Sequence, residues 1–192
     1  MYQIFMKHAE KITKSEAIQV RPILQGVKHF ENGDLAVTDS HRLYFAKEIH
    51  DKGETVLTPK GKKVEGKYPE IRRLFPSQDP QYKLTFDINE LIKGVDIILA
   101  AAKMVDGVPE MSYAENVLFF DSLEVKASYE LPQSIDMYLL SNAQYWMDAL
   151  RLFKAFKYTE IELNIYSRVR PFTLVSLDGK LIALILPMRR EV

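Results

Sequence analysis

The sequence contains no cysteine among its 192 residues. This absence excludes a disulfide framework, a zinc–thiolate site and a thiol nucleophile, and it is compatible with a reducing compartment. An excess of charge of one sign is also lacking, because 26 basic residues balance 26 acidic ones. A balanced chain has no strong overall field to attract nucleic acid or a membrane surface, so any basic patch has to be local.

Targeting and membrane signals are also lacking. The first twelve residues, MYQIFMKHAEKI, are too polar and too short for a signal peptide or a membrane span. The chain is long enough to bury a sizeable core in one or two domains. These observations predict a cytoplasmic protein that does not bind a membrane.

Residues that carry catalytic or metal chemistry are few and scattered. The four histidines stand at positions 8, 29, 41 and 50 without metal-ligand spacing, and no nucleophile elbow is present. Asp39 and His41 are two residues apart in an expected strand, where they would share a face, and such a pair can act as a base and its orienting group. More often such a pair is a hydrogen-bonding anchor at a strand end. The sequence therefore predicts no catalytic residue, no metal site and no cofactor, with an enzyme that uses Asp39 and His41 as a minor alternative.

The last apolar stretch organises the rest of the chain. Residues 181–186 are all apolar, and Asp178-Gly179 just before them predicts a hairpin between strands at 172–177 and 181–186 through a type I′ turn. Pro187 ends the pairing because it has no N–H to donate. An apolar strand that opens into Pro-Met-Arg can form one wall of a surface groove. A C-terminal core strand with a solvated basic end is the alternative.

Two parts of the chain repeat the same order of elements. The first copy is expected to have a strand, a helix capped by Asp87, and three more strands, at 82–86, 88–102, 110–113, 117–120 and 124–129. The second is expected to have a strand at 137–140, a helix capped by Ser141, and strands at 160–165, 172–177 and 181–186. Each copy is too small to bury its own helix and sheet face, so adjacent copies should share a core. The predicted fold class is α+β, with helices on one face of antiparallel sheets built from β-α-β-β-β units.

The first third of the chain reads as a less complete copy that begins at its helix. Residues 2–14 have helical spacing, with Lys7, Lys11 and Lys14 on the face opposite the apolar side chains. Such a basic stripe is usually only a solvated face. Asn32-Gly33 predicts a second type I′ hairpin. Turn and linker residues at 66–69 and 76–80 place a domain boundary near residue 78, which divides the chain into 1–78 and 79–192.

A binding groove suits the remaining features better than an active site. Five apolar residues from three parts of the chain can line a cleft: Leu24, Leu43, Leu186, Pro187 and Met188. Arg42, Arg73 and Arg189 can stand at its rim. Peptide grooves commonly combine apolar pockets with a few polar groups that orient the ligand, and methionine suits adaptable surfaces.

Four stretches resemble the bacterial sliding clamp family, the β subunit of DNA polymerase III, and they occur in that family's order. They are RPILQGV at 21–27, TDSHRL at 38–43, GKYPE at 66–70 and LPMR at 186–189. TDSHRL and LPMR are the more specific motifs. Residues 79–192 resemble a whole C-terminal clamp domain, and residues 1–78 a middle domain that lacks its second half-repeat. The family's first domain has no counterpart in these residues.

The resemblance implies a ring of repeated units whose helices surround duplex DNA, and a non-catalytic tether for replication proteins. Partners would be double-stranded DNA, read without sequence specificity, and short peptides of polymerases and the clamp loader. A homo-oligomer of three or more subunits would be needed to close a ring. By matching motif, the peptide groove would comprise Leu24, Thr38, Ser40, His41, Arg42, Leu43, Pro69, Arg73, Leu74, Pro171, Leu184, Ile185, Leu186, Pro187, Met188 and Arg189. The DNA-facing residues would be Lys7, Lys11, Lys14, Arg21, Lys93, Arg151 and Lys154.

A second function remains open beside this one. The groove motifs are better preserved than the features that build a ring, and the charge balance is neutral whereas the family is typically acidic. The chain is then a clamp-like peptide-binding module that never encircles DNA, such as a phage or mobile-element adaptor, or a decoy of the host clamp.

Overall fold

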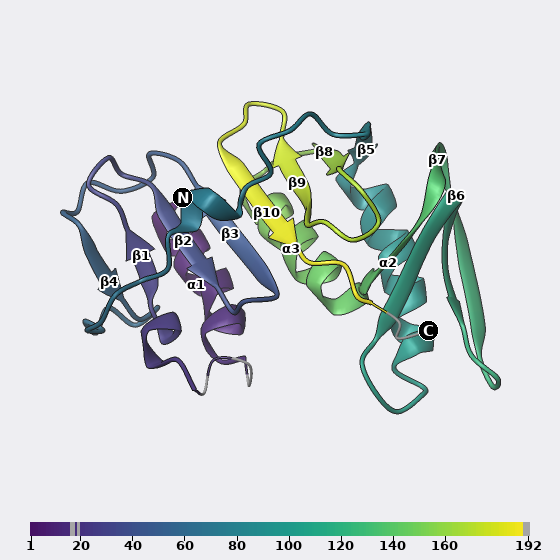
Figure 1. Cartoon of the computed structure of the whole chain (residues 1–192), viewed down its shortest axis with the longest axis horizontal. Coiled ribbons are helices and arrows are strands. Elements are labelled where there is room, and N and C mark those ends of the chain that lie inside the picture. The colour runs from purple at the N-terminus through teal and green to yellow at the C-terminus, as the bar shows by residue number, and fades with distance from the viewer. Residues whose placement is uncertain (16–17, 19, 190–192) are drawn as a thin grey trace.

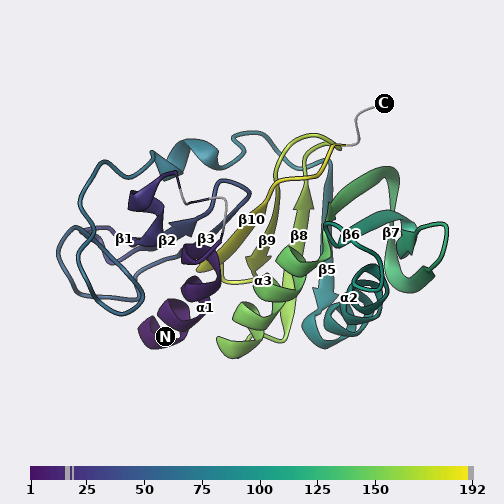
Figure 2. The same ribbon diagram turned by 90° about the horizontal axis from the view of Figure 1, so that it is seen from below.

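The computed structural model describes residues 1–15, 18 and 20–189, which form two antiparallel sheets with three long helices (Figure 1). One sheet has eight strands in the order β4-β1-β2-β3-β10-β9-β8-β5, and β6 and β7 form a separate two-stranded sheet. The described strand pairs are all antiparallel. The helices α1, α3 and α2 line one side of the sheets, as Figure 2 shows, which confirms the predicted α+β class.

The strands of the larger sheet are mostly short. They are β1 (Val27–His29), β2 (Leu35–Thr38), β3 (Arg42–Ala46), β4 (Thr55–Leu57), β5 (Tyr82–Asp87), β8 (Glu160–Ile165), β9 (Phe172–Ser176) and β10 (Leu181–Ile185). The separate sheet has β6 (Glu110–Asp121) and β7 (Lys126–Asn142). The helices are α1 (Tyr2–Thr13), α2 (Ile88–Ala102) and α3 (Ala143–Ala155), with 3-10 helices η2 (Pro22–Gln25) and η3 (Ile71–Leu74). Among the described residues, no helix is long and apolar enough to cross a membrane.

The two later helices begin at polar caps, one of which the sequence predicted. The Asp87 carboxylate accepts hydrogen bonds from the backbone N–H groups of Asn89 (2.8 Å) and Glu90 (3.0 Å), so Asp87 is confirmed as the N-cap of α2. The prediction of Ser141 for α3 is wrong. Strand β7 ends at Asn142, two residues beyond the expected end at residue 140, and the side chain of Asn142 accepts from the N–H of Gln144 at 2.9 Å.

Four short strands were predicted between residues 110 and 140, and this prediction is wrong. The structure has two long strands, β6 and β7, with register shifts between Tyr113, Glu115 and Val117. Glu115 has a φ of 52°, which is the local kink of a bulge. A bulge interrupts the alternation of inward and outward side chains without ending the strand. The interrupted alternation in the sequence therefore predicted two short strands where the structure has one. Strand β7 thereby joins the last strand of the first copy to the first strand of the second.

Both predicted hairpins are present, but their turns are not type I′. Gly33 and Gly179 have positive φ values of 88° and 66°, whereas Asn32 and Asp178 are not among the described residues with positive φ. Type I′ requires positive φ at both central positions. The side chain of Asp178 instead accepts the backbone N–H of Lys180 at 3.0 Å. This bond stabilises the wider turn between Ser176 and Leu181. The turn between His29 and Leu35 is also longer than two residues.

The centre of the eight-stranded sheet is buried on both faces. In β3, Tyr44 and Ala46 belong to a large core that includes all three long helices, while Leu43 and Phe45 belong to a smaller core on the other face. The smaller core is covered by η2, η3 and Tyr68. Strands β3 and β10 pair over five residues, so the sheet continues across residue 78. The division into 1–78 and 79–192 stays a prediction.

A buried histidine fastens α1 to the sheet. His29 on β1 is fully buried, and its Nδ1 donates to the carbonyl oxygen of Val27 at 3.0 Å. A neutral imidazole that donates through Nδ1 has Nε2 free to accept, here from the Tyr2 hydroxyl at 3.0 Å. The ring of His50 lies edge-on to the ring of His29, with 4.9 Å between the ring centroids. Burial lowers the pKa of His29 from 6.5 to about 4.

This histidine predicts a pH window for stability. Between pH 6.5 and about 4 the unfolded chain binds a proton at His29 that the folded chain does not, so the free energy of unfolding falls as the pH falls. The loss across the window is about 3 kcal/mol, and His29→Gln should remove it. Urea unfolding at pH 7 and pH 4.5 measures it. His41→Gln, at an exposed site, is the control, and equal pH dependence in His29→Gln and the parent chain would contradict the assignment.

Candidate functional site: a groove beside β3 and β10

A small cavity of about 160 Å³ opens where the ends of β3 and β10 meet η3. Its lining comprises Arg21, Thr38, Ser40, His41, Arg42, Leu43, Pro69, Leu74, Pro171, Leu184 and Leu186. An apolar protein cavity of about 150 Å³ takes up one benzene molecule. This groove therefore has room for one large apolar side chain and none for a drug-sized ligand.

Ten of the sixteen residues predicted for the groove line this cavity. The other six surround it or point elsewhere. Leu24 is buried in the smaller core, and Ile185 belongs to the large core on the opposite face of β10. Arg73 is exposed on η3, and the segment of Pro187, Met188 and Arg189 continues past the end of β10.

The floor of the groove is apolar and fixed by strand pairing. Leu184 of β10 lies directly opposite Leu43 of β3, and both side chains belong to the smaller core. Beyond the strand, the N–H of Leu186 donates to the carbonyl oxygen of His41 at 2.9 Å. The N–H of Met188 donates to Leu140 at 2.8 Å. The chain after β10 is thereby held along the end of β3.

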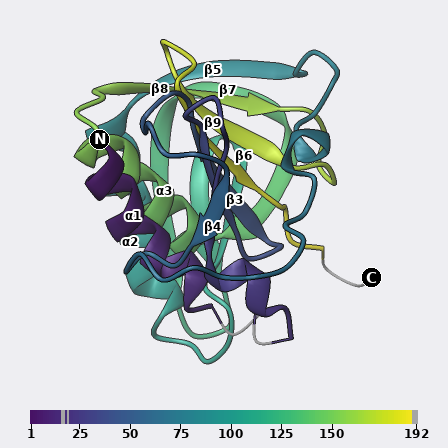
Figure 3. The same ribbon diagram turned by 90° about the vertical axis from the view of Figure 1, so that its left-hand side faces the viewer.

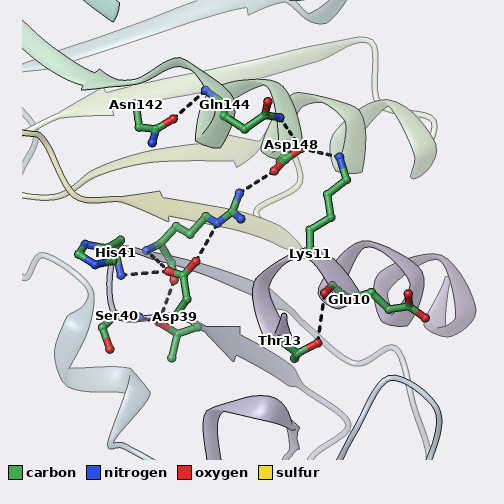
Figure 4. Close-up of polar contacts among 11 residues, drawn as sticks. Glu10, Lys11, Thr13, Asp39, Ser40, His41, Asn142, Gln144 and Asp148 are labelled. Atoms are coloured by element: carbon green, nitrogen blue, oxygen red, sulfur yellow. Dashed lines mark hydrogen bonds and ion pairs between the residues drawn. The ribbon is translucent and has the colours of Figure 1, made fainter. Parts of the chain in front are cut away.

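The TDSHRL motif forms the tight turn between β2 and β3 (Figure 4). Thr38 Oγ1 donates to the carbonyl oxygen of Arg42 at 2.8 Å. Asp39 Oδ1 accepts from the backbone N–H groups of His41 and Arg42, each at 3.0 Å. Ser40 adopts the left-handed region at φ 77°, an uncommon conformation for a residue other than glycine. These bonds hold the turn that presents Ser40 and His41 at the rim.

The expectation that Asp39 and His41 share one face of a strand is wrong, because the two residues belong to this turn. Asp39 is fully buried and bonds the backbone of His41, whereas His41 itself is exposed. The Asp39 carboxylate is engaged by two backbone N–H groups and by the Arg42 side chain. Its role in this geometry is to anchor a turn.

Arg42 connects the groove to the helices through a buried network, which we call the Arg42 network: Asp39, Arg42, Asp148 and Lys11 (Figure 4). Arg42 is 6% exposed, and its Nε donates to Asp39 at 3.1 Å. Its Nη1 donates to Asp148 of α3 at 2.8 Å. Lys11 of α1 donates to the other oxygen of Asp148 at 2.5 Å. The ring of Tyr145 lies 4.3 Å from the guanidinium carbon.

The charges of this network stabilise one another. Burial alone raises the pKa of the Asp148 carboxyl, but hydrogen bonds from Lys11 and Arg42 outweigh burial and lower it below its usual value. Burial also disfavours the charged guanidinium, yet Asp148 and Asp39 contribute to a pKa of Arg42 above its usual value. A buried charge is tolerated only when it is paired and hydrogen-bonded in this way.

Tyr145 and Asp148 were missed by the sequence reasoning. Asp148 is separated from Arg42 by 106 positions, and no local pattern indicates that the two meet. The one available signal was an acidic residue at a position of α3 flanked by the apolar residues Met147 and Ala149.

The predicted DNA-facing residues fall into two groups. The three long helices lie together on one side of the sheet (Figure 3). Six of the predicted residues are exposed on these helices or at their ends: Lys7, Lys11, Lys14, Lys93, Arg151 and Lys154. The structure does not bring Arg21 to this group. Arg21 precedes η2 and lines the groove.

Part of this basic side is neutralised within the chain. Lys14 pairs with Glu10 at 3.0 Å, and Lys93 pairs with Glu90 at 2.6 Å. Lys7 and Arg151 make no ion pair with any described residue. Among the described residues, no group of three or more acidic or histidine side chains is placed to hold a metal ion.

Comparisons with known proteins agree with this geometry. No family model matches the chain. Over 137 residues the chain is 29% identical to the β sliding clamp of Lactococcus lactis subsp. lactis (strain IL1403), covering 66% of this chain and 35% of that protein. The β subunit of DNA polymerase from Streptococcus pyogenes superposes with a TM-score of 0.81 at 20% identity, covering 98% of this chain and 64% of that one. The DNA polymerase sliding clamp of Bacillus subtilis gives 0.79 at 21% identity, with 99% and 62% covered.

The chain therefore has the sliding-clamp fold. The chain resembles bacterial DNA polymerase III β subunits, which confirms the resemblance predicted from the four sequence motifs. Its matched residues span about a third of the curated relative, and the chain spans less than two thirds of the solved clamps.

Removing the carboxylate of Asp148 tests the Arg42 network. Asp148→Asn leaves Arg42 buried with one carboxylate instead of two and should lower the free energy of unfolding by about 3 kcal/mol. Asp96→Asn is the matched control, at an exposed position of α2, and should change stability by less than about 0.5 kcal/mol. Urea unfolding at pH 7 measures both. Equal stability of the two variants would show that the pair contributes nothing.

Proposed function

We propose that this chain acts as sliding clamps do, as a non-catalytic cytoplasmic platform that holds replication proteins at duplex DNA. The observation that carries the proposal is the groove, where ten residues predicted from clamp motifs line one cavity beside the β3–β10 pairing. Its partners are short peptides of DNA polymerases and of the clamp loader, together with double-stranded DNA.

The groove suits an extended peptide that inserts one apolar side chain. Leu43, Leu184 and Leu186 supply apolar contacts, and burying a leucine or phenylalanine side chain contributes about 1.5–3 kcal/mol. Polar groups at the rim, such as those of Ser40 and His41, can orient the peptide. Because the Arg42 network holds the wall in place, little ordering is needed on binding, which favours affinity.

The helix side supplies the DNA contact in this proposal. Six exposed basic side chains lie on or at the end of the long helices, which also carry exposed Glu90 and Asp96, half-buried Glu10, and the buried Asp148 that pairs with Lys11. This excess is local, since the whole chain is neutral. Contacts of this kind go to phosphates, and they depend on salt and not on base sequence.

Truncating the groove should weaken peptide binding. Leu186→Ala removes part of the apolar wall and should raise the Kd for a clamp-binding peptide about 10- to 100-fold. Leu177→Ala is the matched control, because Leu177 is 58% exposed in the β9–β10 turn and does not line the groove. Fluorescence anisotropy with a labelled polymerase peptide measures both. Equal Kd values for the two variants would refute the groove assignment.

The neutral charge and the internally paired lysines favour a second candidate, a peptide-binding adaptor or decoy that never encircles DNA. Light scattering over a range of concentrations, followed by retention on nicked circular DNA, separates the two. The proposed platform should form a closed assembly of three or more copies that stays on circles and is lost when the DNA is linearised. A monomer at every concentration, retained equally by linear and circular DNA, would favour the adaptor.

A further inference from the structure

A second cavity, of about 460 Å³, adjoins the groove on the face of the sheet that carries the smaller core. Lys28 of β1 lies opposite Ala36 and Val56, both members of that core, which places the cavity on this face. Figure 2 shows the teal segment that leads to η3 on the same side, away from the long helices. The lining comprises Lys28, Phe30, Glu54, Gly66, Lys67, Tyr68, Pro69, Glu70 and Arg72. Of these, only Pro69 was predicted for the groove, and it lines both cavities.

The segment between the two cavities is anchored by Tyr68. Its ring belongs to the smaller core, and its hydroxyl donates to the carbonyl oxygen of Gly26 at 3.4 Å. Gly66, two residues earlier, has a φ of 130°, a backbone conformation that residues other than glycine rarely adopt. Lys67 and Pro69, on either side of the buried tyrosine, are exposed. They are therefore presented to solvent from a fixed backbone.

One wall of the cavity is an aromatic ring beside a paired lysine. Lys28 Nζ lies 2.5 Å from a carboxylate oxygen of Glu54 and 5.6 Å from the centroid of the Phe30 ring. The hydrogen bond from Lys28 lowers the pKa of Glu54, so both groups stay charged and neutralise each other at neutral pH. Phe30 is half-buried and adds apolar surface. This wall therefore offers apolar contact and carries no net charge.

The rest of the lining carries cations without partners. Lys67 and Arg72 are exposed and form no ion pair within the described part of the chain. Glu70 is the one remaining acid of the lining. Around these residues, positions 60–73 hold six basic and two acidic side chains. This local excess of positive charge favours an acidic ligand, because complementary charge steers association and suppresses wrong partners.

An acidic segment of the groove peptide fits this cavity better than duplex DNA. An extended peptide advances about 3.3–3.6 Å per residue, so a few residues beyond its apolar side chain pass Pro69 and enter the second cavity. A flexible chain can place one carboxylate beside each free cation and an apolar side chain on Phe30. The helix residues that would face DNA lie across the sheet from this cavity.

We infer that the second cavity binds acidic residues next to the apolar side chain of the groove peptide, with Lys67 and Arg72 contacting their carboxylates. The inference rests on the proposed function, because the groove must hold the peptide first. It names the class of peptide, which has an apolar anchor flanked by aspartate or glutamate. The two cations are exposed, so each contact is weak and sensitive to salt.

The test measures the Kd of the full chain for two labelled peptides by fluorescence anisotropy at about 50 mM salt. Both peptides carry the same apolar anchor. The acidic peptide has aspartate and glutamate on both sides of the anchor, and the neutral peptide has asparagine and glutamine at the same positions. Lys67→Gln/Arg72→Gln should raise the Kd of the acidic peptide about three- to tenfold and leave that of the neutral peptide unchanged. Glu70→Gln should lower the Kd of the acidic peptide about twofold. Salt at about 0.5 M should remove both differences.

Lys103→Gln/Lys157→Gln is the matched control for the removal of two positive charges. Both lysines are exposed just beyond the C-terminal ends of α2 and α3, and they line neither cavity. This variant should bind both peptides as the parent chain does. Unchanged binding of the neutral peptide by Lys67→Gln/Arg72→Gln confirms that the test variant is folded.

Failure of the inference is distinguishable from failure of the proposed function. If the parent chain binds both peptides with equal Kd, or if Lys67→Gln/Arg72→Gln weakens both equally, the second cavity does not recognise acidic residues, while peptide binding in the groove stands. If this variant instead loses binding of a labelled DNA duplex and binds both peptides normally, the cavity is a DNA contact. If neither peptide binds the parent chain, the peptide part of the proposed function falls together with the inference.

Discussion

The buried ion pair between Arg42 and Asp148 is the constraint on which the groove and the helix side both depend. It joins β3 to α3 across 106 positions of sequence. Taking two charges out of water is costly, and here each charge has a second partner, Asp39 for Arg42 and Lys11 for Asp148. Because Lys11 belongs to α1, this network connects the strand that lines the groove to two of the three long helices. The groove is therefore built on a rigid support.

The pairing of β3 with β10 gives the groove its place in the fold. Each of these strands has one face in the large core and one in the smaller core. The smaller core ends near the ends of the two strands, where its members Leu43 and Leu184 also line the open cavity. The apolar pocket is thus an extension of the core that no side chain among the described residues fills. In the proposed function, this pocket receives an apolar side chain of a partner peptide.

The proposed functions occupy different parts of the molecule. The groove lies beside η3 and the segment after β10, while the predicted DNA-facing side chains, except Arg21, lie on the long helices. Peptide binding and DNA contact therefore do not compete for the same residues, with Arg21 as the exception that the structure moves from the predicted DNA side to the groove.

The sequence by itself determined the features that depend on near neighbours. Residues 2–14, Asp87 and the two hairpins were readable because helix periodicity, caps and turns are local, and the TDSHRL and LPMR motifs gave most of the groove lining. Tertiary structure decided the rest. The bulge in β6, the extension of β7 to Asn142 and the turn types depend on strand register and side-chain bonds that periodicity does not encode. The pairing of Asp148 with Arg42 depends on tertiary packing, because it joins α3 to β3 across a long stretch of sequence. A buried charge is stable only when an opposite charge lies beside it, and no local sequence pattern shows which residue supplies that charge.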